Sequence, residues 1–102
     1  MNTADKRLAM KLDLLEKTIV LRKKIKRYWK FDISKKIYIK TLLDIEKILS
    51  SKSLDIDGLY QNALGIGRVV TDGDQDKPIG KELWSYLATV YEFYDSIKEV
   101  QG

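Results

Sequence analysis

The chain has 102 residues, of which 44% are apolar and 33% charged, and its net charge is +4. This length suits a single domain, and this composition argues against a disordered chain. Histidine and cysteine are both absent, which excludes disulfide bonds, thiolate chemistry and the general base that enzymes use most often. We therefore expect one folded domain over residues 1–102 that binds another molecule and is not an enzyme.

Charge is distributed unevenly along the chain. Residues 1–51 hold 14 Lys and Arg against 6 Asp and Glu, whereas residues 52–102 hold 5 against 9. The first half therefore has a net charge of +8 and the second half of −4. Such asymmetry is compatible with a charged partner, and equally with attraction between the two halves within the fold. Both interpretations stay open at this point.

The first predicted helix extends from Thr3 to Lys30 and contains neither glycine nor proline. Two stripes of apolar residues run along it at the helical period. The first stripe is Leu8, Leu12, Leu15 and Ile19, and the second is Leu14, Leu21, Ile25 and Tyr28. Together the two stripes predict a wide apolar face on this helix.

The same periodicity predicts three further helices, over Ser34–Ser51, Ile56–Val70 and Pro78–Val100. Each has one apolar stripe that we expect to face the core: Tyr38, Leu42, Ile45 and Leu49 in the second helix, Ile56, Tyr60, Ala63, Gly67 and Val70 in the third, and Ile79, Leu83, Leu87, Val90, Tyr94 and Ile97 in the fourth. Residues 36–40 alternate as a strand would, but a lone strand would have no pairing partner, so we favour helix there. In the third helix, Gly65 and Gly67 predict close approach of a neighbouring helix, with a break in the helix as the alternative.

The connections between the predicted helices are short, which favours antiparallel packing of neighbouring helices. We therefore predict an all-α fold, an antiparallel four-helix bundle with a long first helix. No apolar run reaches the roughly 20 residues that are needed to span a bilayer. The N-terminal residues also lack the apolar stretch of a signal peptide, so we expect a cytoplasmic protein.

A basic cluster lies at the end of the first predicted helix. It contains Arg22, Lys23, Lys26, Arg27 and Lys30, and the last four share one helix face. Such a face is typical of binding to a phosphate backbone, with an affinity that falls steeply as salt rises. It suits an acidic protein surface equally well. Cations are also stabilising at the C-terminal end of a helix dipole, where they need no partner.

The turn before the last helix is acidic, with Asp72, Asp74 and Asp76 at alternate positions. This spacing matches the opening of a calcium-binding EF-hand loop, but Lys77 replaces its glycine and Leu83 its bidentate glutamate. We therefore expect no bound metal ion and no cofactor. Three exposed carboxylates would repel one another and favour a cationic partner, although Asp and Gly are also ordinary turn residues.

The last predicted helix is rich in aromatic residues. Trp84, Tyr91 and Phe93 cannot all lie on one helix face, so we expect some of them to be partly exposed. Exposed aromatic residues often anchor protein interfaces, whereas core packing is the ordinary alternative. Trp84 and Tyr91, together with the three aspartates, are therefore candidate partner-binding residues. Ile39 and Leu43 lie off the main stripe of the second helix and are compatible with a dimer or partner contact.

The stretches GIGRVVTD, at the end of the third helix, and PIGKELWSYL, at the start of the fourth, resemble small all-helical immunity proteins. These proteins belong to bacterial toxin–immunity systems, either contact-dependent or bacteriocin-like. The resemblance covers about a third of the chain, from Gly58 to Leu87. It implies a cytoplasmic protein that binds one cognate toxin, often over the toxin's active site. The basic first half departs from the acidic balance of many nuclease inhibitors, so a nuclease target would have to meet the acidic half.

The leading hypothesis is a protein-binding module, most specifically an immunity protein that neutralises a bacterial toxin by direct binding. The alternative is a nucleic-acid-binding or regulatory helical protein that uses the basic cluster. A third interpretation is a structural homo-oligomer or adaptor. The three differ in the surface that they use.

Overall fold

The computed structural model describes residues 3–28 and 33–101. Its four α-helices are α1 (Thr3–Tyr28), α2 (Ile33–Ser50), α3 (Ile56–Val69) and α4 (Pro78–Gln101). A single π-helical turn, η1 (Val70–Asp74), follows α3 directly. The described residues form no strand, which confirms the all-helical prediction. Residues 36–40, which alternate in sequence as a strand would, are part of a helix. None of their helices is long and apolar enough to cross a membrane.

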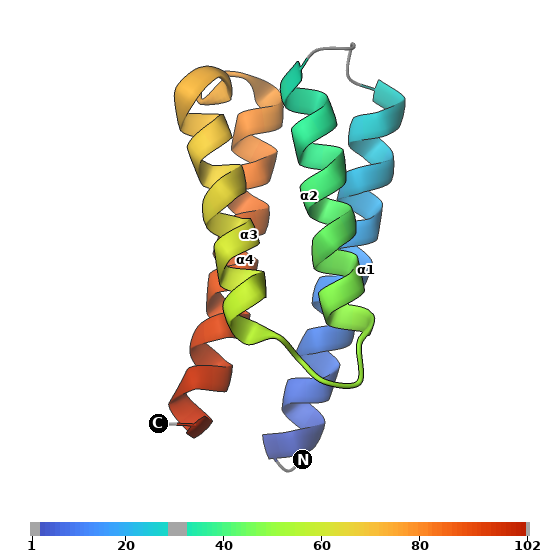
Figure 1. Cartoon of the computed structure of the whole chain (residues 1–102), viewed down its shortest axis with the longest axis vertical. Coiled ribbons are helices and arrows are strands. Elements are labelled where there is room, and N and C mark those ends of the chain that lie inside the picture. The colour runs from blue at the N-terminus through green and yellow to red at the C-terminus, as the bar shows by residue number, and fades with distance from the viewer. Residues whose placement is uncertain (1–2, 29–32, 102) are drawn as a thin grey trace.

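The helices pass alternately up and down the long axis of the molecule, and the start of α1 and the end of α4 lie at the same end (Figure 1). α1 packs against α2 and α4, and α3 packs against the same two helices. The molecule therefore consists of two helical hairpins side by side. We call α1 with α2 the first hairpin, and α3 with η1 and α4 the second hairpin. They correspond closely to the basic and acidic halves of the sequence.

The hydrophobic core lies between the two hairpins, and each helix contributes one stripe to it. The stripe predicted for α2 is confirmed, since all its members are buried: Tyr38, Leu42, Ile45 and Leu49. The other helices contribute Leu14, Leu21 and Ile25 from α1, Leu59, Ala63 and Ile66 from α3, and Leu83, Leu87 and Val90 from α4. The helical period therefore accounts for most of the core.

The structure corrects the wide apolar face that was predicted for α1. Leu14, Leu21 and Ile25 of the second stripe are buried, but Leu8 and Leu12 of the first stripe are 54% and 56% exposed. α2 ends at Ser50, and the Lys11 ammonium donates a hydrogen bond to the Ser51 carbonyl just beyond that end, at 3.2 Å. The first turns of α1 thus extend past the end of α2 (Figure 1). α4 still lies beside these turns, where Met10 packs against the core. Leu8 and Leu12 come six and two residues before the buried Leu14, which places them on the other side of α1, so they stay at the surface.

Glycines have different roles in the second hairpin. α3 continues without interruption through Gly65 and Gly67, so the alternative of a break there is wrong. A Cβ on Gly67 would meet the Trp84 ring at 3.5 Å, an ordinary contact, and a Cβ on Gly65 would meet nothing within 4 Å. At Gly80, however, a Cβ would overlap the main-chain carbonyl oxygen of Asp74. Gly80 therefore permits the close approach of η1 to the first turn of α4.

Candidate partner-binding site

The three aspartates predicted to form one acidic turn occupy different environments. Asp72 and Asp76 are exposed, but Asp74 is only 3% exposed. The Tyr38 hydroxyl donates a hydrogen bond to the Asp74 carboxylate at 2.6 Å, and Lys77 pairs with that carboxylate at 2.8 Å. The prediction of three uncompensated carboxylates on an exposed loop is therefore wrong. The reason is that η1 keeps the segment helical, which places Asp74 one turn after the buried Val70.

Asp74 links the two hairpins. Burial alone would raise its pKa, but hydrogen bonds from Lys77, Tyr38 and Ser34 outweigh burial and lower the pKa of Asp74 below its ordinary value. The carboxylate is therefore charged at neutral pH. Its bonds to Tyr38 and Ser34 fasten η1 to the first turns of α2. This contact fixes the position of the neighbouring Asp72.

Three of the five predicted partner-binding residues lie together. Asp72, Trp84 and Tyr91 line one shallow groove of about 280 Å³ between α3 and α4. The Trp84 ring lies against Gly67 of α3 and is still 40% exposed. The remaining lining residues are Leu64, Gly67, Arg68 and Thr71. Asp76, although exposed, does not line this groove.

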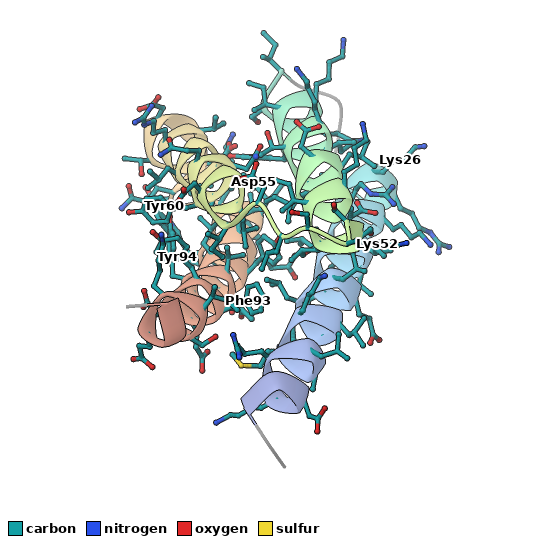
Figure 2. The ribbon with its side chains drawn as sticks, turned by 60° about the horizontal axis from the view of Figure 1, so that its bottom comes forward. Lys26, Lys52, Asp55, Tyr60, Phe93 and Tyr94 are labelled. Carbon is teal, nitrogen blue, oxygen red and sulfur yellow. The ribbon has the colours of Figure 1, made fainter. Side chains whose placement is uncertain are left out.

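The aromatic surface continues along α3 and α4 away from the groove. The Tyr60 ring makes an edge contact with Tyr91, with centroids 5.9 Å apart, and stacks on Tyr94 at 4.7 Å. The Lys98 ammonium lies 5.6 Å from the Tyr94 ring centre and 3.5 Å from the Asp57 carboxylate. Figure 2 shows Tyr60 and Tyr94 close together on one side of the molecule. We call this surface the aromatic strip, formed by Tyr60, Leu64, Trp84, Tyr91 and Tyr94.

Sequence reasoning assigned Tyr60 and Tyr94 to core stripes, whereas the structure leaves both half-buried in the aromatic strip. The spacing of the aromatic residues on α4 could have indicated that Tyr94 belongs to the same surface as Trp84 and Tyr91. Trp84 and Tyr91 are seven residues apart and Tyr94 follows three later, so all three share one side of the helix. Partial burial raises the pKa of Tyr91. Its hydroxyl is protonated at neutral pH in any case and can donate a hydrogen bond to a partner.

One member of the basic cluster, Arg22, forms an ion pair within the fold. Arg22 forms an ion pair with Glu46 of α2 through two nitrogens, one of them 3.1 Å from Oε1. Both side chains are less than one-fifth exposed, and the hydrogen bond to Glu46 raises the pKa of Arg22. Arg22 is therefore paired within the fold, although it was predicted as a member of the basic cluster that could bind a partner. Of the other members of the cluster, Lys23, Lys26 and Arg27 are exposed, and Lys30 lies outside the described residues.

The two oppositely charged hairpins meet each other only in part. Lys24 of α1 pairs with Glu82 of α4, so one ion pair crosses directly between them. In Figure 2, Lys26 and Lys52 lie on the side of the first hairpin, and Tyr60 and Tyr94 lie on the opposite side. The molecule therefore presents two outer surfaces of different chemistry.

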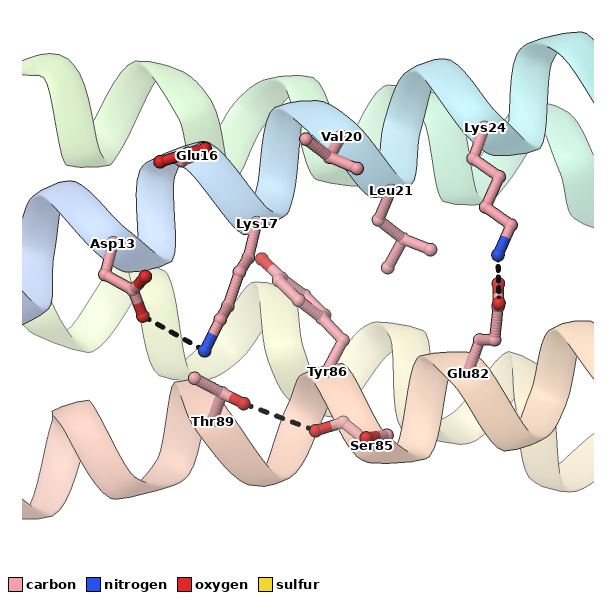
Figure 3. Close-up of a pocket in the computed structure, with 10 residues that line it drawn as sticks. All are labelled: Asp13, Glu16, Lys17, Val20, Leu21, Lys24, Glu82, Ser85, Tyr86 and Thr89. Atoms are coloured by element: carbon pink, nitrogen blue, oxygen red, sulfur yellow. Dashed lines mark hydrogen bonds and ion pairs between the residues drawn. The ribbon is translucent and has the colours of Figure 1, made fainter.

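A second groove, of about 500 Å³, runs between α1 and α4 (Figure 3). Beneath it, the Thr18 hydroxyl donates a hydrogen bond to the Leu14 carbonyl at 2.7 Å, so the Tyr86 hydroxyl is the donor in its own 2.7 Å bond to Thr18. Burial raises the pKa of Tyr86. Because the Thr18 and Tyr86 hydroxyls are paired and buried, we interpret them as a link between the hairpins.

No protein-family model, curated protein or solved structure matches this chain. Within residues 3–28 and 33–101, no group of three or more acidic, histidine or cysteine side chains is placed to hold a metal ion. The best-supported candidate binding site is the aromatic strip. It has Asp72 at one end and Asp57 and Lys98 at the other.

Proposed function

We propose that this chain is a protein-binding module, built as an antiparallel four-helix bundle, that uses the aromatic strip as its binding surface. Its partner would be one cognate bacterial toxin, which the chain neutralises in the cytoplasm as an immunity protein. The observation that supports this proposal is the grouping of Trp84, Tyr91 and Asp72 in one groove. Partly exposed aromatic anchors with a charged rim are typical of protein interfaces.

The surroundings of the aromatic strip indicate the chemistry of the partner. Asp72 lines the groove, and Asp95, four residues after Tyr91 on α4, is exposed beside the strip. Arg68 is an exposed cation at the groove. A matching surface would insert apolar side chains between the aromatic rings and place basic groups near Asp72 and Asp95. Such charge complementarity raises the association rate and favours the correct partner.

Binding to nucleic acid through the basic cluster is the second candidate. The exposure of Lys23, Lys26 and Arg27 favours it, and the ion pair between Arg22 and Glu46 weighs against it. A gel-shift assay with RNA and DNA at low salt distinguishes the two candidates. Nucleic-acid binding predicts a shift that disappears as salt rises, whereas binding through the aromatic strip predicts none.

The experiment that tests the proposal measures binding of this chain to an inactivated form of the toxin encoded beside its gene, by isothermal titration calorimetry. Trp84→Ala should weaken binding at least about 30-fold, which corresponds to about 2 kcal/mol for an interface anchor. Asp72→Asn should have a smaller effect, mainly on the association rate. The matched control is Val20→Ser, because Val20 is 58% exposed and lies on α1, outside the strip.

Growth of cells that express the active toxin gives a second measurement. The unaltered chain and Val20→Ser should both protect the cells, whereas the double variant Trp84→Ala/Tyr91→Ala should not. Circular dichroism first checks that the double variant is folded. Full protection and unchanged affinity in a folded double variant would show that the aromatic strip is not the binding surface.

A further inference from the structure

The outer face of the first hairpin has a distinct composition of lysines and aliphatic side chains. Lys23 follows the buried Leu14 by nine residues, about two and a half helical turns, and so lies on the opposite side of α1. The same argument places Lys47, five residues after the buried Leu42, on the outer side of α2. We call this surface the lysine–leucine face; its members are Leu8, Leu12, Ile19, Lys23 and Lys26 of α1 and Lys40, Leu43 and Lys47 of α2.

Three of the four apolar members of the lysine–leucine face are exposed, and the fourth, Ile19, is half-buried. Leu8 and Leu12 are 54% and 56% exposed, and Leu43 is 38% exposed. On α1 they lie in the same row as the lysines, because Leu8, Leu12, Ile19, Lys23 and Lys26 follow one another at steps of three, four or seven residues. One helix row thus changes from leucine to lysine along its length.

The lysines of this face are available to an external anion. Lys23, Lys26, Lys40 and Lys47 are exposed, and none of them forms an ion pair with another described residue. The acidic residues that border the face are Asp5, Glu16 and Asp44, so the lysines are in excess. Arg22 and Glu46 neutralise each other between the two helices. The face therefore attracts anions.

We propose that the lysine–leucine face docks the protein on an anionic lipid bilayer. Lysines near such a surface are attracted by its negative potential, and exposed aliphatic side chains bury themselves at the boundary between headgroups and acyl chains. A basic patch and an apolar insertion together give a stable attachment that neither gives alone. In Figure 2, Lys26 of this face lies on one side of the molecule and Tyr60 and Tyr94 of the aromatic strip lie on the other, so the strip would stay free for a protein partner.

The composition of the face favours a bilayer over nucleic acid. Single-stranded nucleic acid is held by aromatic stacking as well as by charge, and base edges are read chiefly by bidentate arginine. The lysine–leucine face has no aromatic member among the described residues. Of the two arginines of α1 near its lysines, Arg22 is paired with Glu46, and Arg27 is a single exposed arginine among the lysines. Leucines that are more than half exposed gain nothing from a phosphate backbone, but they gain apolar burial in a bilayer.

The test measures co-sedimentation of the full chain with vesicles of phosphatidylglycerol and phosphatidylcholine in equal amounts, and with vesicles of phosphatidylcholine alone. We expect binding to the anionic vesicles that is at least about tenfold stronger than to the neutral ones and that falls as salt rises. Lys23→Glu and Leu12→Ser should each weaken binding about fivefold to tenfold. Both substituted side chains are exposed, so the variants should fold.

Matched controls separate this face from a general effect of charge or apolar content. Lys81→Glu makes the same charge change at an exposed position on α4, and Val20→Ser removes an apolar side chain that is 58% exposed on another side of α1. Both should bind vesicles as the unaltered chain does. Equal losses in Lys81→Glu and Lys23→Glu would contradict the proposal, as would equal binding to neutral vesicles or none to anionic ones.

A parallel titration with single-stranded and double-stranded oligonucleotides at the same salt decides the competing interpretation. Binding to an oligonucleotide that is tighter than to vesicles, depends on Lys23 and is unchanged by Leu12→Ser would overturn the membrane proposal in favour of nucleic acid. Toxin binding by Lys23→Glu and Leu12→Ser should be unchanged in every case. The two proposals therefore fail or succeed separately.

Discussion

The two hairpins are alike toward the core and different toward the solvent. In both, each helix buries one apolar stripe at the helical period. The outer side of the first hairpin presents lysines in line with exposed leucines, whereas the outer side of the second presents partly exposed aromatic rings with acidic residues beside them. The core therefore explains the fold, and the outer faces are where function should be sought.

The two hairpins are also held together by polar contacts besides the core. The Tyr38–Asp74 and Thr18–Tyr86 hydrogen bonds are buried, and the Lys24–Glu82 ion pair is partly exposed. An unpaired polar group in the interior costs more than an apolar replacement, so these contacts disfavour other ways of packing the hairpins. The following predictions test this arrangement, from the largest expected effect to the smallest.

Gly80→Ala should reduce the free energy of unfolding by about 3 kcal/mol, because the new Cβ would overlap the main-chain oxygen of Asp74 and push η1 away from α4. Urea denaturation measures this change. The control is Gly65→Ala, where nothing lies within 4 Å of the new Cβ. That control should gain up to about 1 kcal/mol from the better helix propensity of alanine. Equal stability of the two variants would mean that η1 and α4 are not closely packed.

Tyr38→Phe should reduce the free energy of unfolding by about 2 kcal/mol, because it removes a hydrogen bond to a buried carboxylate. Tyr94→Phe is the control, since the Tyr94 hydroxyl makes no hydrogen bond with the described residues. Thermal and urea unfolding should show no measurable change in that variant. A comparable loss in both variants would mean that the Tyr38–Asp74 hydrogen bond makes no special contribution to stability.

The contribution of Asp74 to stability should depend on pH in a defined direction. The pKa of Asp74 is lowered in the folded state from an ordinary value of 3.8, so the folded chain binds this proton less readily than the unfolded chain. The stability that its charge contributes is therefore complete above pH 3.8 and is lost as the pH falls further, through the folded pKa. Unfolding of the unaltered chain and of Asp74→Asn, measured from neutral to acidic pH, should converge at the acidic end. A constant difference would contradict this linkage.

Glu46→Gln should reduce the free energy of unfolding by about 1 kcal/mol, because it leaves the partly buried Arg22 without its anion. The exposed pair of Asp13 and Lys17 on α1 gives the control, with both side chains more than half exposed. Asp13→Asn should change stability by less than about 0.5 kcal/mol, as for most surface ion pairs. If both variants lost the same amount, the Arg22–Glu46 pair would have no special structural role.

Much of the fold could be predicted because helix formation is encoded locally. Apolar spacing located the four helices, and the stripe of α2 was correct to the residue. The aromatic strip was predicted in part: Trp84 and Tyr91 were named as candidate partner-binding residues, but Tyr60 and Tyr94 were assigned to the core. A helical stripe does not reveal how far the next helix covers it, and that coverage decides which aromatic residues remain at the surface.

The sequence by itself determined the four helices, the division into a basic and an acidic half, and the lack of histidine and cysteine chemistry. Only the tertiary structure decided that Leu8 and Leu12 are exposed, that Arg22 is paired and that Asp74 is buried. The physical reason is the range of the interactions. The helical period depends on residues within a few positions, whereas burial and pairing depend on where distant helices end and which side they face.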